Sequence, residues 1–269
     1  MTPPRVLSIA GSDSGGGAGI QADLKAFARC GVHGMTAITA ITAQNTLTVT
    51  EVHPVPPEMI VEQVRVVAAD IGVDAVKIGM LGTTETIQAA ERALELVADA
   101  PVVLDPVMVA ESGAVLLDES ARAALREQLV ARATVVTPNL AEARVLADTG
   151  EDASPEDLAR AVHALGPEAV VVTGGHREEA IDLFFDGEHL VEIPGERHPG
   201  GTAHGSGCTH SSALAAYLAL GHEPLEAAKR AKQVAADAVR DGLRDIGAGV
   251  GPVDALGALR RPDGQTPLT

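Results

Sequence analysis

Short apolar runs alternate with helical patterns along almost the whole chain, and this alternation limits the possible folds most strongly. The expected strands cover residues 6–10, 36–43, 49–55, 75–78, 102–104, 134–136 and 169–172. The expected helices cover residues 20–30, 84–97, 118–129, 140–146, 155–165 and 224–242, and two more begin at Pro56-Pro57 and after Cys208. Such alternation predicts an α/β fold with a mainly parallel sheet covered on both faces. Residues 181–185 and 189–193 instead flank Asp186-Gly187, which indicates a hairpin.

The composition narrows the classes of partner. Hydrophobic residues make up 46% of the chain and aromatic residues only 1%, so we expect a core of Ala, Val, Leu and Ile. Scarce aromatic residues disfavour stacking on nucleic-acid bases. A net charge of −17 repels a phosphate backbone, so we expect no nucleic-acid partner.

Length and cysteine usage indicate the organisation and location of the chain. No shift in composition divides the 269 residues, so we expect one domain over residues 1–260 and a flexible tail over residues 261–269. The two cysteines, Cys30 and Cys208, fit neither a disulfide framework nor a metal-finger spacing, which favours the cytoplasm. We recognise no signal peptide and no apolar run long enough for a membrane span, so we expect no membrane partner.

A glycine-rich turn over residues 200–207 leads into Cys208 and an apolar helical pattern. Glycines let the backbone approach a ligand, and the first N–H groups of a helix point outward without intrahelical partners. With the helix macrodipole they favour an anion, most often a phosphate. Cys208 stands in the first turn, where a thiolate is favoured. A plain loop followed by a small buried cysteine would explain the same residues.

Another glycine-rich loop, residues 11–19, follows the first strand. It is not a P-loop because no Gly-Lys-Ser/Thr follows its glycines, and it holds only a fragment of a dinucleotide fingerprint. Asp23, near the start of the next helix, would either compensate the helix dipole or bind a polar small molecule. Gln44 offers a donor and an acceptor to a heteroaromatic ring, although Gln44-Asn45 also fits a simple turn.

Several expected strands end at glycine or polar residues, namely Gly11, Gly79-Met80, Asp105, Asn139 and Gly174-Gly175. Because ligands of open α/β sheets bind at the carboxyl ends of the strands, we expect these residues to line one edge of the sheet. Asp105 and Glu142 carry carboxylates suited to Mg²⁺ and substrate phosphates, although Glu142 could simply stabilise a helix start. The histidines at 198, 204 and 210 lack the spacing and neighbouring carboxylates of a zinc site.

Together these features suggest phosphoryl transfer. An anion-binding helix start, carboxylates for Mg²⁺ and a loop for a small substrate are the parts of such a site, which works by positioning and charge neutralisation. Cys208 would lie where the transferred phosphate meets the acceptor hydroxyl. It would act there as a base or as a simple contact to that hydroxyl.

Seven segments, in order between residues 5 and 245, carry a resemblance to a known family. They are residues 10–25 (AGSDSGGGAGIQADLK), 42–46 (TAQNT), 76–81 (VKIGML), 104–108 (LDPVM), 137–143 (TPNLAEA), 174–176 (GGH) and 204–209 (HGSGCT). The chain thereby resembles the hydroxymethylpyrimidine/phosphomethylpyrimidine kinases of thiamine biosynthesis. The resemblance implies a ribokinase-like fold, in which helices flank a central, mostly parallel sheet on both faces. It also implies ATP, Mg²⁺ and a homodimer.

The implied reaction is phosphorylation of 4-amino-5-hydroxymethyl-2-methylpyrimidine and then of its monophosphate. By resemblance, the residues that hold the pyrimidine are Gly11, Asp23, Gln44, Met80 and Val107. Asp105 and Glu142 would manage Mg²⁺. Nucleotide contacts would come from Asn139, Glu142, Thr173 and Gly175. The catalytic anion hole would consist of Gly205, Ser206, Gly207 and Cys208, with Cys208 in place of the aspartate that most sugar kinases of this fold carry.

One departure concerns charge. The family commonly has Val-Lys-Gly-Gly-His where this chain has Val172-Thr173-Gly174-Gly175-His176, so a lysine that would neutralise ATP phosphates is missing. Thr173 can donate only a neutral hydrogen bond. Compensation could come from Mg²⁺, from Lys77 or Arg177, or from high salt.

Two rivals to the pyrimidine kinase follow from the same residues. A pyridoxal-type kinase of the same fold would act on a similar hydroxymethyl heteroaromatic ring. A non-catalytic sensor of the pyrimidine or of a nucleotide would explain the missing lysine. The full set of motifs favours the pyrimidine kinase.

Overall fold

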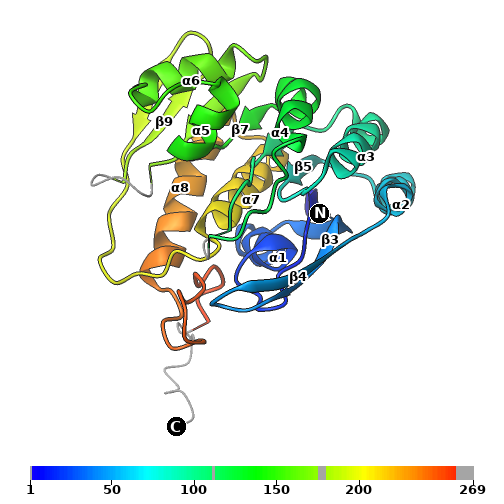
Figure 1. The fold of residues 1–269 in the computed structure, drawn as a ribbon, viewed down its shortest axis with the longest axis horizontal. Coiled ribbons are helices and arrows are strands. Elements are labelled where there is room, and N and C mark those ends of the chain that lie inside the picture. Colours follow the sequence, from blue (N-terminus) through cyan, green and yellow to red (C-terminus); the bar gives the residue numbers. More distant parts are fainter. Residues whose placement is uncertain (1, 111–112, 175–179, 259–269) are drawn as a thin grey trace.

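The computed structural model describes residues 2–110, 113–174 and 180–258. Its central sheet consists of β1 (Arg5–Ala10), β2 (His33–Ile38), β5 (Ala75–Ile78), β6 (Val102–Leu104), β7 (Val135–Val136), β8 (Ala169–Val172), β9 (Asp182–Phe185) and β10 (Leu190–Ile193). The order across the sheet is β10-β9-β8-β7-β6-β5-β1-β2, and Figure 1 labels β9, β7 and β5 along it. The strands from β8 to β2 are parallel, whereas β9 and β10 are antiparallel additions at one edge. This mostly parallel sheet confirms the predicted fold class, and the β9–β10 pair confirms the predicted hairpin.

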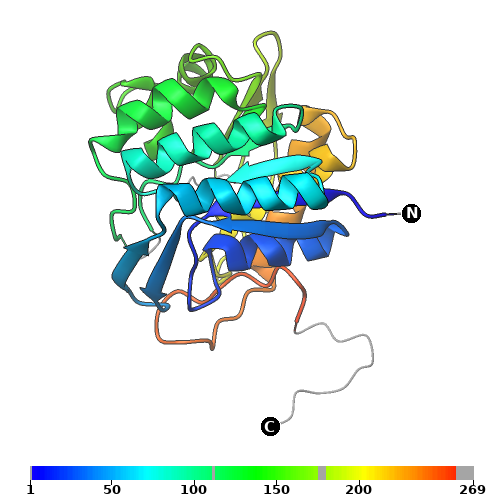
Figure 2. The same cartoon turned by 90° about the vertical axis from the view of Figure 1, so that its right-hand side faces the viewer.

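Helices cover both faces of the sheet (Figures 1 and 2). One face carries α1 (Gly19–Cys30), α7 (Ser206–Ala219) and α8 (Pro224–Arg240). The other face carries α2 (Pro57–Asp70), α3 (Thr84–Leu94), α4 (Ala121–Ala124), α5 (Leu140–Ala147) and α6 (Pro155–His163). Successive residues of β1 serve the two cores alternately, because strand side chains point to opposite faces: Val6 packs on one side and Leu7 on the other.

Helix α7 is the most central helix and the one that begins at the glycine-rich turn. It packs between α1 and α8 and against β1, β5 and β6. The run Ala213–Ala216 is fully buried. The small side chains of this run let the neighbouring helices approach closely. The start of α7 is therefore held rigidly near the carboxyl ends of the parallel strands.

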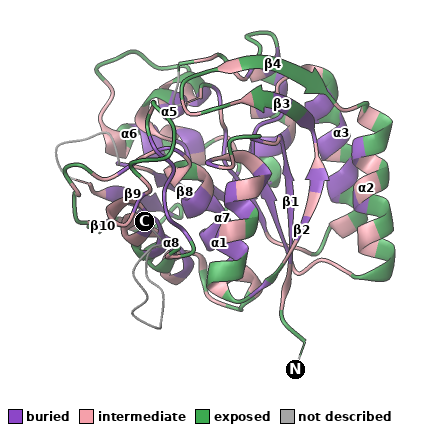
Figure 3. Ribbon diagram, turned by 90° about the horizontal axis from the view of Figure 1, so that it is seen from below, coloured by how far each residue is buried: buried purple, intermediate pink, exposed green. Residues whose placement is uncertain are grey.

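The prediction of a single strand over residues 36–43 is wrong. The chain leaves the sheet after β2, and β3 (Ala40–Gln44) pairs with β4 (Val49–Pro54) as a separate antiparallel ribbon. Thr39 marks the exit: it is buried, its N–H donates to the Ala10 carbonyl (3.0 Å) and its hydroxyl to the Met80 carbonyl (2.8 Å). The alternating pattern continues through the exit, so periodicity could not reveal it. The ribbon carries Gln44, and Figure 3 shows much of it exposed.

The remaining boundaries differ by a few residues. The helix predicted over residues 118–129 begins only at Ala121, and after α4 it continues as a π-helical turn over Leu125–Leu129. The single domain stays a prediction, and the predicted tail lies outside the described residues. Across the described ranges, none of the helices has the length and apolar character needed to cross a membrane.

Candidate active site

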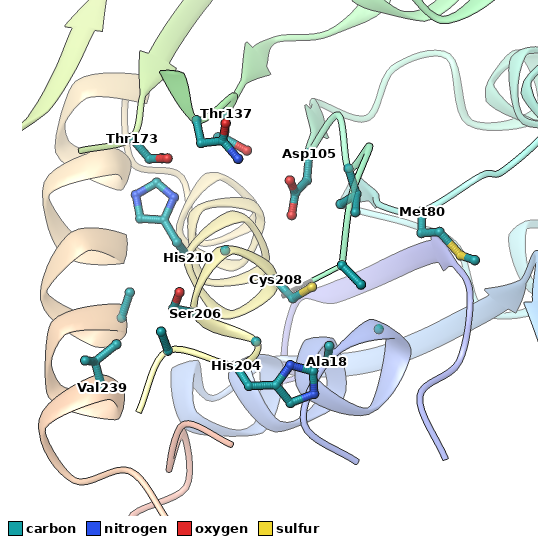
Figure 4. Close-up of a pocket in the computed structure, with 18 of the residues that line it drawn as sticks. Ala18, Met80, Asp105, Thr137, Thr173, His204, Ser206, Cys208, His210 and Val239 are labelled. Atoms are coloured by element: carbon teal, nitrogen blue, oxygen red, sulfur yellow. The ribbon is translucent and has the colours of Figure 1, made fainter. Parts of the chain in front are cut away.

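A cavity of about 530 Å³ opens at the carboxyl ends of the parallel strands. Its lining includes Gly11, Met80, Asp105 and Asn139, which follow four different strands. The structure thus brings these residues to one edge of the sheet, as the topology of parallel strands requires. Figure 4 shows Met80 toward one end of the cavity, Thr173 toward the other, and Asp105 and Cys208 between them.

The end of the cavity near Met80 contains four of the five residues that the resemblance assigned to the substrate. They are Gly11, Gln44, Met80 and Val107. Gln44 reaches the cavity from β3, so the ribbon β3–β4 contributes part of this wall.

Asp23 does not line the cavity, so its predicted contact with substrate is corrected. Its side chain is fully buried: Oδ1 accepts from Lys77 Nζ (2.9 Å) and Ser212 Oγ (2.8 Å), and Oδ2 accepts from Ser8 Oγ (2.6 Å). Burial lowers the pKa of the Lys77 ammonium group, but neighbouring acidic groups, Asp23 first among them, raise it more, so Lys77 stays protonated above its ordinary range. Asp23 therefore fixes a buried cation at the wall of the cavity.

The first glycine-rich loop is organised by Asp13, a residue that the sequence pattern does not single out. Its carboxylate accepts from the N–H groups of Gly15 (2.8 Å), Gly17 (2.9 Å) and Ala18 (2.8 Å). His204 Nε2 lies 3.1 Å from Asp13 Oδ2, and both side chains are buried. Burial raises the pKa of Asp13, but the His204 and backbone hydrogen bonds lower it more, to below its usual value. The short Asp-x-Gly spacing was the one available signal for this turn, because Asp side chains often bond the backbone two residues on.

The second glycine-rich turn meets the first directly. Gly205, the residue before α7, has φ +84°, and a Cβ placed there would lie 1.8 Å from the carbonyl oxygen of Gly17. Only glycine fits this approach. The N–H of Ser206 donates to the Ala203 carbonyl (2.9 Å) and that of Thr209 to the Gly205 carbonyl (2.9 Å). Gly207 and Cys208 lie in the same first turn of α7, where backbone N–H groups have no partner within the helix.

The predicted thiolate at Cys208 is wrong. Burial raises the pKa of the Cys208 thiol to about 12; Lys77 and the Gly19 N–H oppose this rise, while Asp23 and Asp105 add to it. The helix start is too weak to overcome loss of solvent and two neighbouring carboxylates. Cys208 is therefore a neutral thiol that lines the cavity beside the helix start.

Asp105 and Glu142 form a pair of buried carboxyl groups at the cavity wall. Asp105 Oδ2 accepts from Ser211 Oγ (2.9 Å), and burial raises the pKa of Asp105 although Lys77 opposes this. Burial and then Asp105 raise the pKa of Glu142 to about 8. Glu142 also closes a capping box with Asn139, in which each side chain accepts from the other's N–H (2.9 Å). Two acids that repel each other suit a divalent cation.

The far end of the cavity contains Thr173, together with three residues not singled out for nucleotide binding: Asp182, His210 and Lys232. Ser206 and Gly207 also line the cavity, whereas Gly175 lies outside the described residues, as does Arg177. Of the proposed substitutes for the missing lysine, Lys77 is already paired with Asp23.

Comparison with known proteins supports the kinase family that the sequence motifs indicated. The family model described as phosphomethylpyrimidine kinase matches residues 13–254. The chain belongs to this family. It is 51% identical over 254 residues to the hydroxymethylpyrimidine/phosphomethylpyrimidine kinase of Rhizobium meliloti, which covers 92% of this chain and 95% of the relative. The family and its named members identify the chain as a phosphotransferase.

Solved structures support the fold assignment. The phosphomethylpyrimidine kinase of Clostridium difficile has a TM-score of 0.75 and 39% identity, covering 86% of this chain and 96% of that chain. The pyridoxal kinase of Staphylococcus aureus in complex with AMP-PCP and pyridoxal has a TM-score of 0.87 and 37% identity, covering 97% and 96%. The ribokinase-like fold predicted from the motifs is confirmed.

Proposed function

We propose that this kinase phosphorylates 4-amino-5-hydroxymethyl-2-methylpyrimidine and then its monophosphate, with ATP as the phosphate donor. Family membership and the named relatives support the pyrimidine substrate. The AMP-PCP complex of the Staphylococcus aureus enzyme supports a nucleotide donor. The observation that carries the proposal is the single cavity that joins Gln44 and Met80 to the glycine-rich start of α7.

The two ends of this cavity have different tasks. Gln44, Met80 and Val107 would hold the pyrimidine ring, and the amides of Gly207 and Cys208 would bind the phosphate under transfer. Asp105 and Glu142 would hold Mg²⁺, which when bound neutralises phosphate charge. The neutral Cys208 thiol would contact the acceptor hydroxyl, and buried Lys77 would counter negative charge at this centre.

A pyridoxal kinase activity is the second candidate, and one observation favours it. The Staphylococcus aureus pyridoxal kinase has the higher TM-score of the two structures compared, 0.87 against 0.75. Both substrates carry a hydroxymethyl group on a nitrogen heterocycle, so one cavity could accept either.

A comparison of the two substrates in parallel assays separates these candidates. The protein is incubated with ATP and Mg²⁺ and with either the hydroxymethylpyrimidine or pyridoxal, and product formation is followed by mass spectrometry. We expect a higher kcat/KM for the pyrimidine and a second phosphorylation of its monophosphate. A higher kcat/KM for pyridoxal would replace the pyrimidine as the preferred substrate, and no product from either would refute the proposal. Omission of Mg²⁺ should abolish turnover.

We further propose that the chain forms a homodimer through the exposed β3–β4 ribbon. Three apolar side chains of the ribbon and its turn are exposed: Ile41 (55%) on one face, Val52 (41%) on the other, and Leu47 (58%) between the two strands. Exposed apolar side chains that lie close together mark interaction surfaces. Sedimentation of wild type against an Ile41→Lys, Val52→Lys variant tests this: a wild-type dimer that becomes a monomer supports it, and a wild-type monomer refutes it. The cytoplasmic location stays a prediction.

A further inference from the structure

The cavity end near Thr173 needs a positive charge if it holds nucleotide phosphates. Within the described residues, the Lys and Arg side chains that line the cavity are Lys77, Arg197 and Lys232. Lys77 is fully buried and paired with Asp23 below Cys208. Thr173 itself brings no charge, and its hydroxyl makes only a long contact to the Pro138 carbonyl (3.5 Å).

Lys232 is held at this end of the cavity by a buried ion pair with Asp182. The residue lies on α8, its side chain is only 12% exposed, and Nζ donates to Asp182 Oδ1 at 2.6 Å. Asp182 is itself 1% exposed and also accepts from the N–H of Gly174 (2.8 Å). A Cβ on Gly195 would lie 2.4 Å from Lys232 Cε and 2.7 Å from the Ala180 carbonyl oxygen, so a side chain there would force the lysine or the backbone to move. An ammonium group has three donors, so the Asp182 bond leaves capacity for a ligand.

His210 adds an independent observation. The residue is 4% exposed, lies on α7 and lines the cavity, and Figure 4 shows its ring beside Thr173. Neither ring nitrogen has a hydrogen-bond partner in the described part of the chain. Nε2 is 3.6 Å from Asp182 Oδ2, which is too long for a hydrogen bond. Burial lowers the pKa of His210, helped by Lys232 and opposed by Asp182, so the ring is neutral.

A buried, unpartnered imidazole is costly unless a ligand completes its hydrogen bonds. Here it faces the same space as a confined ammonium group. A phosphate oxygen could accept from both, since a neutral imidazole has one N–H and the lysine remains charged. A neutral hydroxyl or carbonyl ligand would also pair with the imidazole, but it would form a weaker hydrogen bond with the charged Lys232 ammonium group than a phosphate oxygen would.

We propose that Lys232 and His210 bind the phosphates of the nucleotide at the Thr173 end of the cavity, with Asp182 as the positioning residue that holds Lys232. This inference rests on the proposed use of ATP. Lys232, on α8, would supply the positive charge that Thr173 does not provide.

The test measures binding rather than turnover. ADP and adenosine are titrated by calorimetry into wild type, Lys232→Met and the matched control Lys229→Met, which removes the same charge from an exposed position one turn earlier on α8. Loss of a charge-assisted hydrogen bond predicts a rise of about tenfold or more in the Kd of ADP for Lys232→Met. Adenosine, which has no phosphate, should bind Lys232→Met as tightly as it binds wild type. The control Lys229→Met should bind both ligands as wild type does. Lys232→Arg should recover part of the affinity for ADP.

A further variant keeps the proposal falsifiable if Lys232→Met fails to fold. His210→Leu removes the unpartnered ring, so thermal stability should be kept or raised while ADP binding weakens about threefold or more. ADP affinity within twofold of wild type in whichever of these variants fold, or an equal loss for ADP and adenosine, would overturn the assignment. If ADP binding depends on Lys232 but no pyrimidine is phosphorylated, the proposed function fails and this inference stands.

Discussion

Removal of the buried Lys77 ammonium group at the cavity wall should destabilise the whole protein. Lys77 and Asp23 are both 0% exposed and lie 2.9 Å apart. Lys77→Met fills a similar volume but leaves the Asp23 carboxylate buried without its counter-charge. Hydrogen bonds from Ser8 (2.6 Å) and Ser212 (2.8 Å) remain to that carboxylate.

The size of the effect follows from the burial of both charges. Removal of one partner of a buried ion pair costs about 3–5 kcal/mol, and we expect the lower end because the two serine hydroxyls remain. Asp23→Asn should also destabilise, since it leaves the Lys77 ammonium buried. The double variant leaves neither charge of the pair, so its loss should be smaller than the sum of the single losses by about 1–3 kcal/mol.

Urea unfolding followed by circular dichroism measures these differences. With an m-value of about 3 kcal/mol per M, a loss of about 3 kcal/mol lowers the midpoint by about 1 M. Arg65→Met is the matched control, because it breaks an exposed ion pair with Glu62 (2.6 Å) and should leave the midpoint unchanged. If Lys77→Met unfolds at the same midpoint as Arg65→Met, or if the single losses simply add, the reasoning is refuted.

Three further predictions concern the site. Cys208→Ala should cut turnover far more than it weakens ADP binding, because the helix-start amides remain; equal turnover would remove Cys208 from the reaction. Asp13→Asn should destabilise the protein at neutral pH but less below pH 3.8. Because the pKa of Asp13 is lowered in the folded state, its carboxylate stabilises the fold fully above pH 3.8, and this stabilisation is lost as the pH falls. Urea midpoints measured at pH 7 and pH 3 check this, and an equal effect of the substitution at both would contradict it. In metal-free buffer, the pKa of Glu142 is about 8 in the folded protein against the ordinary 4.5. As the pH rises, the Glu142 carboxyl group therefore loses its proton in the unfolded protein before it does so in the folded protein, and the stability should fall between pH 4.5 and 8. Glu142→Gln should flatten that fall in urea midpoints, and an unchanged slope would show that Glu142 does not titrate there.

Local sequence patterns determined much of the fold. The strands β5, β6 and β8 begin and end at the predicted residues, because buried runs bounded by glycine, proline or polar residues are a local signal. The rule that parallel strands expose their carboxyl ends together then predicted that Asp105 and Asn139 would share one cavity. Motif resemblance added the family and the reaction.

Tertiary structure decided the charge states and the partners. Asp23 turned from a proposed substrate contact into a buried counter-ion because Lys77, 54 residues further on, folds against it. Cys208 is a thiol and not a thiolate because burial and two carboxylates from distant parts of the sequence, Asp23 and Asp105, outweigh the local helix dipole. Lys232 and His210 meet at Asp182 only because α7 and α8 pack side by side against the sheet. Local periodicity is a property of neighbouring residues, whereas a pKa or an ion pair depends on solvent exclusion and on groups that only the folded chain brings together.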